Sequence, residues 1–277
     1  MHIANLDTFV AILECGNMNR AAERLHVTQS TVNARLNNLE QVLGQPLFHR
    51  RKSGAELTAA GFRFERYARL MTDVWRQAQQ ETALPKSVGS VCNLGCHPDL
   101  WQTRGEHIFT LIQGAHPDIA GSAWPGEQDR LNQWMNNGLL DMTVCYTPNL
   151  DEKWQAFEIG VEQLIQVATV KRDRIRSDPD YIYVDYGERF RQDHAAAYPD
   201  ADTPKMTMGS AEWALSYLLE TGGSAYLPAT RVRTLIKRGR LFQVAGADEF
   251  SRQYYLVVNH TSAEKWPWFD GFLTNLT

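Results

Sequence analysis

Amide, hydroxyl and guanidinium side chains are concentrated in one short segment near the N-terminus, between residues 28 and 38. An α-helix fits the major groove of DNA, and such side chains match the donors and acceptors on base edges there. Gln29 suits a bidentate contact with adenine, and Arg35 suits guanine or a phosphate. We expect DNA contacts from Arg20, Thr28, Gln29, Ser30, Thr31, Asn33 and Arg35. A solvated helix face would show the same pattern, so the pattern alone favours neither interpretation.

A basic group follows at Arg50, Arg51 and Lys52, directly before Ser53 and Gly54. The surrounding residues 47–57 read as strand, turn and strand, the form of a wing. Cations on such a turn neutralise phosphates beside the groove, which adds affinity without sequence information. The alternative interpretation is an ordinary basic turn.

Three helices are expected ahead of the wing. The first carries apolar residues at helical spacing and stops at Gly16; the second is capped by Asn19 and ends at Leu25. Thr28 is expected to cap a third helix, residues 28–43, which Gly44 and then Pro46 bring to an end. The apolar residues that this third helix should bury are Val32, Leu36, Leu39 and Leu43.

A long helix is expected from Ala59 to Glu81, capped by Thr58. It carries an apolar stripe with alternating spacings of three and four, namely Phe64, Tyr67, Met71, Val74 and Ala78. Such a heptad pattern predicts pairing with the same helix of a second subunit. The alternative is that the stripe packs on its own domain.

The length of the chain and the distribution of its charges indicate two parts. Its 277 residues are many for one core, so two domains are expected. Residues 1–82 carry 10 Lys and Arg against 8 Asp and Glu, whereas residues 83–277 carry 18 against 24. The N-terminal part is therefore the candidate anion binder. Four scattered cysteines, no export signal and no apolar run long enough for a bilayer predict a cytoplasmic protein that does not contact a membrane.

Beyond residues 83–89, expected to be a hinge, short apolar strands alternate with helical stretches such as 100–112, 127–137, 211–219 and 229–237. This alternation predicts an α/β domain over residues 90–277 with a mainly parallel sheet. The chain shows no glycine-rich phosphate loop, paired-histidine metal motif or nucleophile elbow, so we expect neither an enzyme nor a resident cofactor or metal. An enzyme or solute-binding protein with a helical front end is the competing class.

Residues 1–61 resemble the DNA-binding domain of LysR-type transcriptional regulators. The resemblance rests on Arg20–Val32, Leu39-Glu40, Leu43–Phe48, Arg50 and Leu57–Gly61. It implies a winged helix-turn-helix domain (residues 1–58), a dimerising linker helix (59–82) and an effector domain with a periplasmic-binding-protein-like fold. Family members assemble as dimers and tetramers on double-stranded operator DNA, and activators contact RNA polymerase. Asn37 and Asn38 depart from the family, which often places basic residues there.

The resemblance further implies a small-molecule effector held between subdomain I (about 90–163 and 252–277) and subdomain II (about 164–251). Matching strand ends and helix N-termini suggest contacts from Cys96, His97, Asp99, Trp101, Trp124, Thr147, Asp185, Tyr186, Ser210 and Tyr226. The C-terminal half also resembles, in places, the branch that includes regulators of the flagellar master operon.

Two other interpretations stay open. Cys92 and Cys96 beside His97 would allow a thiol-based redox sensor, although a buried Cys92 and a ligand-facing Cys96 are favoured. Alternatively, the protein binds DNA without an effector and its C-terminal domain only oligomerises.

Overall fold

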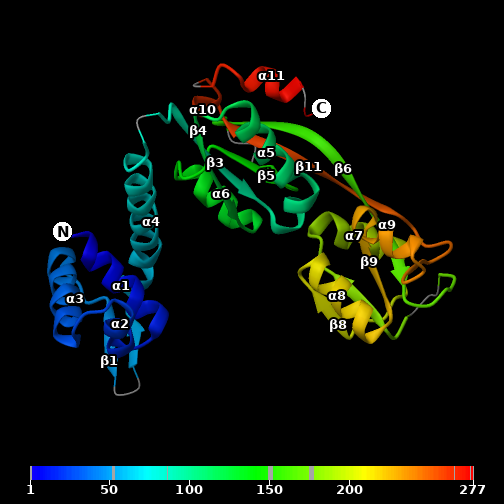
Figure 1. Cartoon of the computed structure of the whole chain (residues 1–277). Coiled ribbons are helices and arrows are strands. Elements are labelled where there is room, and N and C mark those ends of the chain that lie inside the picture. The colour runs from blue at the N-terminus through cyan, green and yellow to red at the C-terminus, as the bar shows by residue number, and fades with distance from the viewer. Residues whose placement is uncertain are drawn as a thin grey trace. The chain divides into compact units, whose positions relative to one another are not determined.

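The computed structural model in Figure 1 describes residues 2–51, 54–85, 87–148, 152–174, 178–264, 266–274 and 276. The chain divides into two compact units, Met1–Ser87 and Val88–Thr277. This boundary falls inside the range expected for the hinge, residues 83–89. Each unit has its own buried core and is described by itself below.

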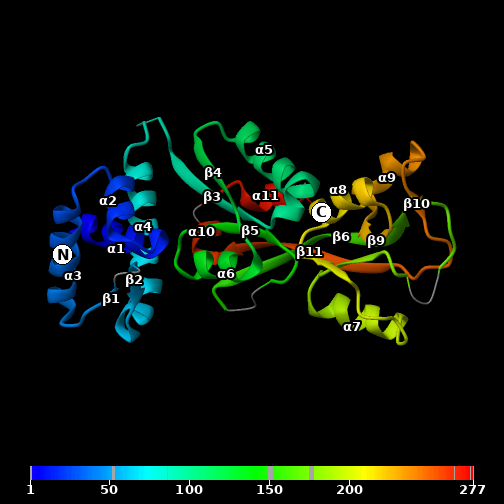
Figure 2. The same cartoon turned by 90° about the horizontal axis from the view of Figure 1, so that it is seen from below.

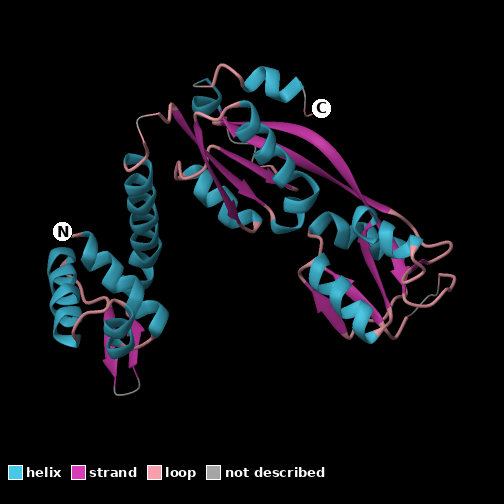
Figure 3. Ribbon diagram, viewed as in Figure 1, coloured by secondary structure: helices cyan, strands magenta, loops and turns pink. Residues whose placement is uncertain are grey.

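The N-terminal unit is a helical bundle with one β-hairpin and a long final helix (Figure 3). Its elements are α1 (Ile3–Cys15), α2 (Met18–Arg24), α3 (Gln29–Leu43), β1 (Phe48–Arg51), β2 (Gly54–Leu57) and α4 (Ala59–Thr82). Leu6, Phe9, Ile12, Leu36 and Leu39 are fully buried between the helices. Helical spacing thus places the apolar residues of α1 and α3 in one core, as the sequence predicts.

Helix boundaries in this unit follow capping chemistry. Thr28 Oγ1 accepts the Thr31 N–H at 3.2 Å, and Gly44 ends α3 in the left-handed conformation at φ 68°. Two expectations were wrong. Asn17, not Asn19, caps α2, because Asn17 has extended backbone and its Oδ1 accepts the Asn19 N–H. Leu43 is 38% exposed, because it is the last residue of α3 and lies beyond the core.

The start of α4 is tied to the bundle. Thr58 Oγ1 donates to the Pro46 carbonyl at 2.7 Å and accepts the Gly61 N–H at 3.0 Å. A Cβ on Gly61 would collide with the Leu47 carbonyl oxygen. Further along α4, Arg69 contacts Glu14 of α1 at 3.1 Å. The first turns of α4 therefore belong to the folded body of the unit.

In the C-terminal unit, nine strands among the described residues form one sheet in the order β4-β3-β5-β11-β6-β9-β7-β8, with β10 also paired to β6. The strands are β3 (Ser90–Cys96), β4 (Ile119–Pro125), β5 (Met142–Cys145), β6 (Trp154–Ala168), β7 (Tyr181–Val184), β8 (Met206–Met208), β9 (Ser224–Pro228), β10 (Phe242–Gln243) and β11 (Phe250–Asn259). The expectation of a mainly parallel sheet was wrong. The long strands β6 and β11 run antiparallel to each other and to their neighbours β9 and β5.

Helices cover both faces of the sheet. They are α5 (Glu106–Ala115), α6 (Gln128–Asn136), α7 (Glu188–Ala197), α8 (Ala211–Thr221), α9 (Ala229–Lys237), α10 (His260–Glu264) and α11 (Phe269–Thr274). Figure 2 shows α5 and α6 on opposite sides of β3 and β5. In subdomain II, α8 and α9 pack in one apolar cluster and α7 packs in another. Helix 100–112 was expected to be continuous, but a π-helical turn at Trp101–Gly105 precedes α5.

Candidate nucleic-acid interface and inter-subdomain site

The first turn of α3 presents polar side chains to solvent. Gln29 and Ser30 are exposed, and Arg35 one turn further on is half-buried. Thr28 is committed to the cap, and its hydroxyl also lies 2.8 Å from Ser30 Oγ and 2.9 Å from Thr31 Oγ1. Thr28 and Thr31 therefore hold the first turn in shape and leave Gln29 free to point outward.

The other predicted contacts lie nearby in the unit. Arg20 is exposed on α2, and Asn33 is half-buried on α3. Asn38 also makes a contact within the unit, because its Oδ1 accepts a hydrogen bond from Nδ2 of the buried Asn5 at 2.8 Å. Asn38 thus links α1 to α3 and is still exposed, as is Asn37.

Residues 48–51 and 54–57 pair as the two strands of the expected hairpin. Phe48 pairs with Leu57 and Arg51 with Gly54 in antiparallel register. Glu40 of α3 fixes its base, because Oε1 accepts the Leu47 and Phe48 N–H groups at 2.7 and 3.3 Å. The side chains of Arg50 and Arg51, and the whole of Lys52, lie outside the described residues, so their expected phosphate contacts stay predictions.

The predicted stripe on α4 is divided between two faces. Phe64 and Met71 pack against the core of their own unit, and Phe64 lies 5.2 Å from Phe9 between ring centroids. For these two residues the structure agrees with the alternative of packing on their own domain, and their part in pairing stays a prediction. Tyr67 and Val74 are 48% and 42% exposed, and Ala78 is exposed as well. An exposed apolar seam thus remains on α4.

In the C-terminal unit, a buried ion pair joins the two long strands. Glu162 of β6 and Arg252 of β11 lie directly opposite in register, and Arg252 Nε contacts Glu162 Oε2 at 2.7 Å. Their side chains are 13% (Arg252) and 1% (Glu162) exposed. Tyr146, after β5, donates its hydroxyl to the same carboxylate oxygen at 3.0 Å. The Arg252 guanidinium lies over the rings of Tyr146 and Tyr186, 3.5 and 4.4 Å from their centroids.

Further charged groups from both subdomains extend this network. Asp99 Oδ2 lies 3.8 Å from Arg252, and the Asp99 carbonyl accepts a hydrogen bond at 2.8 Å from Arg231 of α9. Arg231 also pairs with Glu212 of α8. His97 Nε2 lies 3.2 Å from Glu127 Oε2, and the His97 ring packs edge-on against Tyr146. We call Asp99, Tyr146, Glu162, Tyr186, Arg231 and Arg252 the inter-subdomain network.

Burial sets the protonation states at this site. It lowers the pKa of His97 despite the carboxylates of Glu127 and Asp99, so the neutral imidazole is favoured. It raises the pKa values of the Tyr146 and Tyr186 phenols well above their usual range, although Arg252 opposes the change. Both phenols therefore act as neutral hydrogen-bond donors.

Two atoms of the network have no hydrogen-bond partner among the described residues: Glu162 Oε1 and Arg231 Nε. Both atoms are buried. A buried polar atom without a partner costs about 1–3 kcal/mol, so such atoms mark a place where a bound molecule could supply the missing contact. Glu162 Oε1 can accept a hydrogen bond, and Arg231 Nε can donate one.

The structure brings together only part of the predicted effector set. His97, Asp99 and Tyr186 belong to the network or contact it. Cys96 and Trp101 instead pack in the apolar core of subdomain I, and Tyr226 is fully buried among aromatic rings in subdomain II. Cys96 and Tyr226 were wrong as accessible ligand contacts, because β3 and β9 are covered on both faces at these residues. Trp101 is half-buried, and its contact with a ligand stays a prediction.

The remaining predicted residues are engaged locally. Trp124 is 43% exposed and donates Nε1 to Ser122 Oγ at 2.9 Å. The Thr147 N–H donates to Gln128 Oε1 at 3.3 Å. Asp185 contacts Arg191 at 3.2 Å, and Ser210 caps α8. Whether these four reach a ligand stays a prediction.

Sequence reasoning missed Glu162, Arg252, Tyr146 and Arg231. The sequence suggested short apolar strands, whereas β6 and β11 are long and extend over the charged residues Glu162 and Arg252. The available signal was the pair of opposite charges, Glu162 and Arg252, within two strand-forming segments.

The cysteines do not support the redox interpretation. Cys92 and Cys96 are four residues apart on the extended strand β3, so their Cα atoms lie about 13 Å apart, far beyond disulfide reach. Burial raises the pKa of Cys96 to about 12 and that of Cys145 to about 11, which opposes thiolate formation. Within the described residues, no group of three or more His, Cys, Asp or Glu side chains could hold a metal ion.

A winged helix-turn-helix domain with a long final helix, followed by an α/β unit with two subdomains, defines a class of DNA-binding transcription regulators. Residues 3–62 match the family model of the bacterial regulatory helix-turn-helix protein, lysR family. The match confirms the resemblance of the N-terminal domain to this family.

Curated relatives are similar in sequence along almost the whole chain. The HTH-type transcriptional regulator HdfR of Shigella boydii is 28% identical over 256 residues, covering 91% of this chain and 90% of that protein. HdfR of Escherichia coli O17:K52:H18 gives the same identity and coverage. These relatives are transcriptional regulators, and this chain is similar to them along almost its whole length.

Solved structures share the fold. CbnR, a LysR family transcriptional regulator, matches with a TM-score of 0.75 at 18% identity over 100% of this chain and 98% of that one. Vibrio fischeri DarR, solved in complex with DNA, matches with a TM-score of 0.60 at 18% identity over the same shares. No helix in the described part of the chain is long and apolar enough to cross a membrane.

Proposed function

We propose that this protein is a cytoplasmic regulator that reads an operator with the first turn of α3, anchors on phosphates with the β1–β2 turn, and changes activity when a small molecule binds between its subdomains. The single observation that carries DNA reading is the capped first turn of α3, which leaves Gln29 and Ser30 exposed on a domain that matches the lysR family model. Helix-turn-helix modules make their base contacts from this position.

Two buried atoms of the inter-subdomain network lack hydrogen-bond partners among the described residues, which supports the proposal that an effector binds there. A hydrogen-bond donor on a bound molecule would satisfy Glu162 Oε1, and an acceptor would satisfy Arg231 Nε. These two residues lie on β6, which runs through both subdomains, and on α9 of subdomain II. Binding there would favour one arrangement of the subdomains over another, a population shift. The relatives named HdfR, with the resemblance to flagellar regulators, favour motility genes as the target.

One experiment tests this proposal. Purified protein selects bound fragments from the host's genomic DNA, and the best fragment is footprinted with and without candidate metabolites. A partly palindromic footprint that a metabolite alters supports the whole proposal. A specific footprint that no metabolite alters supports the effector-independent alternative, in which the C-terminal unit only oligomerises. Binding without sequence preference would contradict DNA reading itself.

Replacing Gln29 with Ala is expected to cost about 1–3 kcal/mol at the preferred operator and to relax base choice at one position of each half-site, because one bidentate base contact is lost. Affinity for operator variants at each position, measured by fluorescence anisotropy, checks this. Gln41→Ala is the matched control, because Gln41 is exposed at the far end of the same helix. Equal effects of both substitutions would exclude Gln29 as a base reader.

Self-association through α4 is the second part of the proposal. Tyr67 and Val74 form an exposed apolar seam at heptad spacing. Val74→Glu is expected to weaken dimerisation about tenfold or more, because it places a charge in the seam. Sedimentation over a concentration series measures this, with Gln80→Glu as the control on another face of α4. A dimer unaffected by Val74→Glu would exclude this seam.

A further inference from the structure

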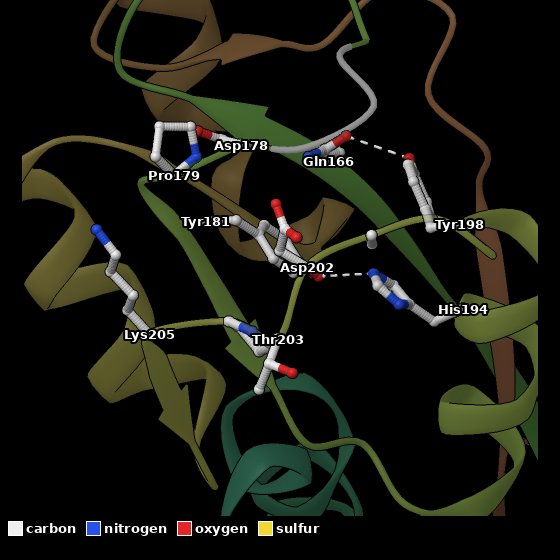
Figure 4. A pocket seen from close by; sticks show the side chains of 11 residues that line it. Gln166, Asp178, Pro179, Tyr181, His194, Tyr198, Asp202, Thr203 and Lys205 are labelled. Atoms are coloured by element: carbon white, nitrogen blue, oxygen red, sulfur yellow. Dashed lines mark hydrogen bonds between the residues drawn. The ribbon is translucent and has the colours of Figure 1, made fainter.

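Subdomain II contains a cavity separate from the inter-subdomain network. Its volume is about 260 Å³, and its lining comes from β6, the start of β7, the end of α7 and the loop of residues 201–205 that leads to β8. Pockets for drug-sized ligands span about 300–1,000 Å³, so this cavity suits a smaller molecule, such as one with a single ring. Figure 4 shows Lys205 and His194 on opposite sides of the cavity, with Tyr181 between them.

The rings of Tyr181, His194 and Tyr198 form one side of the cavity, which we call the inner wall. The His194 ring stacks between Tyr181 and Tyr198, with centroids 5.6 and 4.9 Å away. His194 Nε2 lies 3.0 Å from the Tyr181 hydroxyl, and the Tyr198 hydroxyl donates to Gln166 Oε1 at 3.3 Å. Burial lowers the pKa of His194, which keeps this wall uncharged near neutral pH. The inner wall therefore offers a ligand flat, uncharged ring surface.

The lining also includes two carboxylates and one ammonium group, and both carboxylates are engaged. The Asp178 carboxylate accepts hydrogen bonds from Arg172 and Ser224. Asp202 likewise has an interaction partner. Lys205 is exposed at the opening, and no hydrogen bond or ion pair with another described residue engages its ammonium group. The Lys205 ammonium is thus the charged group of this cavity that remains to receive a ligand.

The charges of the lining select a ligand with one negative charge. A carboxylate can form a charge-assisted hydrogen bond with the Lys205 ammonium, whereas an amine is repelled by it. Asp178 and Asp202 repel further negative charge, so a monocarboxylate is favoured over a dicarboxylate. An aromatic ring on this ligand would pack against the inner wall. We propose that this cavity of subdomain II binds a small aromatic monocarboxylate, with its carboxylate at Lys205 and its ring against the inner wall.

The cavity wall is joined to the inter-subdomain network by hydrogen bonds. The Tyr198 hydroxyl lies 2.7 Å from the Tyr226 hydroxyl, and the Tyr226 carbonyl accepts the Tyr186 hydroxyl at 2.9 Å. Tyr186 in turn lies under Arg252. A ligand bound against Tyr198 would therefore contact a chain of hydrogen-bonded residues that continues to the inter-subdomain network.

Calorimetric titration of the full-length protein with benzoate, phenylacetate and 3-phenylpropanoate tests the proposal. These probes place one aromatic ring at three different distances from the carboxylate. At least one is expected to bind with a Kd below about 5 mM, and its uncharged amide is expected to bind about tenfold more weakly or worse. No binding of any of the three up to that concentration, or equal affinity for the acid and its amide, would overturn the proposal.

Variants locate the site. Lys205→Met is expected to raise the Kd about tenfold or more, and Ala201→Trp, which places a bulky side chain at the opening, is expected to abolish binding. Lys237→Met is the matched control, an exposed lysine on α9 away from the cavity lining. Binding that persists unchanged in Ala201→Trp or Lys205→Met would place the probe elsewhere, for example at the inter-subdomain network, and would overturn the assignment. These titrations contain no DNA, so their outcome is independent of operator reading.

Discussion

Arg252→Met is expected to lower the free energy of unfolding of the C-terminal unit by about 3–5 kcal/mol, because it leaves the buried Glu162 carboxylate without its cation. Glu162 is 1% exposed on its side chain, so water cannot replace the guanidinium. Asp99 also loses its nearest cation in the network. Chemical denaturation followed by tryptophan fluorescence measures the change.

A double variant tests whether the unpaired charge causes this loss of stability. Glu162→Gln combined with Arg252→Met removes both charges, so the double variant is expected to be more stable than Arg252→Met alone. Glu162→Gln alone should cost less than Arg252→Met, because Asp99 and the two phenol rings still surround Arg252. A double variant no more stable than Arg252→Met would show that packing, and not the ion pair, dominates.

Gly61→Ala is expected to destabilise the N-terminal unit by about 3 kcal/mol and to weaken DNA binding, because the new Cβ would collide with the Leu47 carbonyl oxygen and push α4 away from the hairpin. Intrinsic helix propensity alone predicts the opposite, an increase of about 1 kcal/mol in the stability of this unit. Thermal unfolding and operator affinity of the variant decide between the two.

Gly114→Ala is the matched control for Gly61→Ala. Gly114 lies in α5, where an added Cβ has no neighbouring atom within 4 Å. This variant should be as stable as the wild type or slightly more stable. If Gly61→Ala behaved like Gly114→Ala, the close approach of α4 to residue 47 would be refuted.

The N-terminal unit was predictable because its sequence signals are local. Thr28, Gly44 and Thr58 cap helices by bonds to residues a few positions away. The split of the α4 stripe was not predictable, because spacing alone places Phe64 and Tyr67 on one stripe. Only the packing of Phe64 on Phe9, 55 positions away in the chain, separates them.

The inter-subdomain network could be predicted only in part. Residues after strands β3 and β7, such as His97, Asp99 and Tyr186, were found because strand ends can be read locally. Glu162 and Arg252 meet across 90 positions of sequence, and their contact depends on the register of two long antiparallel strands. The cavity in subdomain II was missed for a similar reason: its wall needs α7, which reads as a polar segment with only Phe190 buried.

The most direct measurement of sequence-specific DNA binding compares the affinity of the full-length protein for its selected operator and for a shuffled duplex of equal length and composition at physiological salt. If Gln29 and its neighbours at the start of α3 read the base sequence, the affinity for the operator is expected to be at least about 1,000-fold higher than that for the shuffled duplex. This factor is the lower end for specific regulators. Equal affinities for the two duplexes would contradict the assignment of α3 as the element that reads sequence.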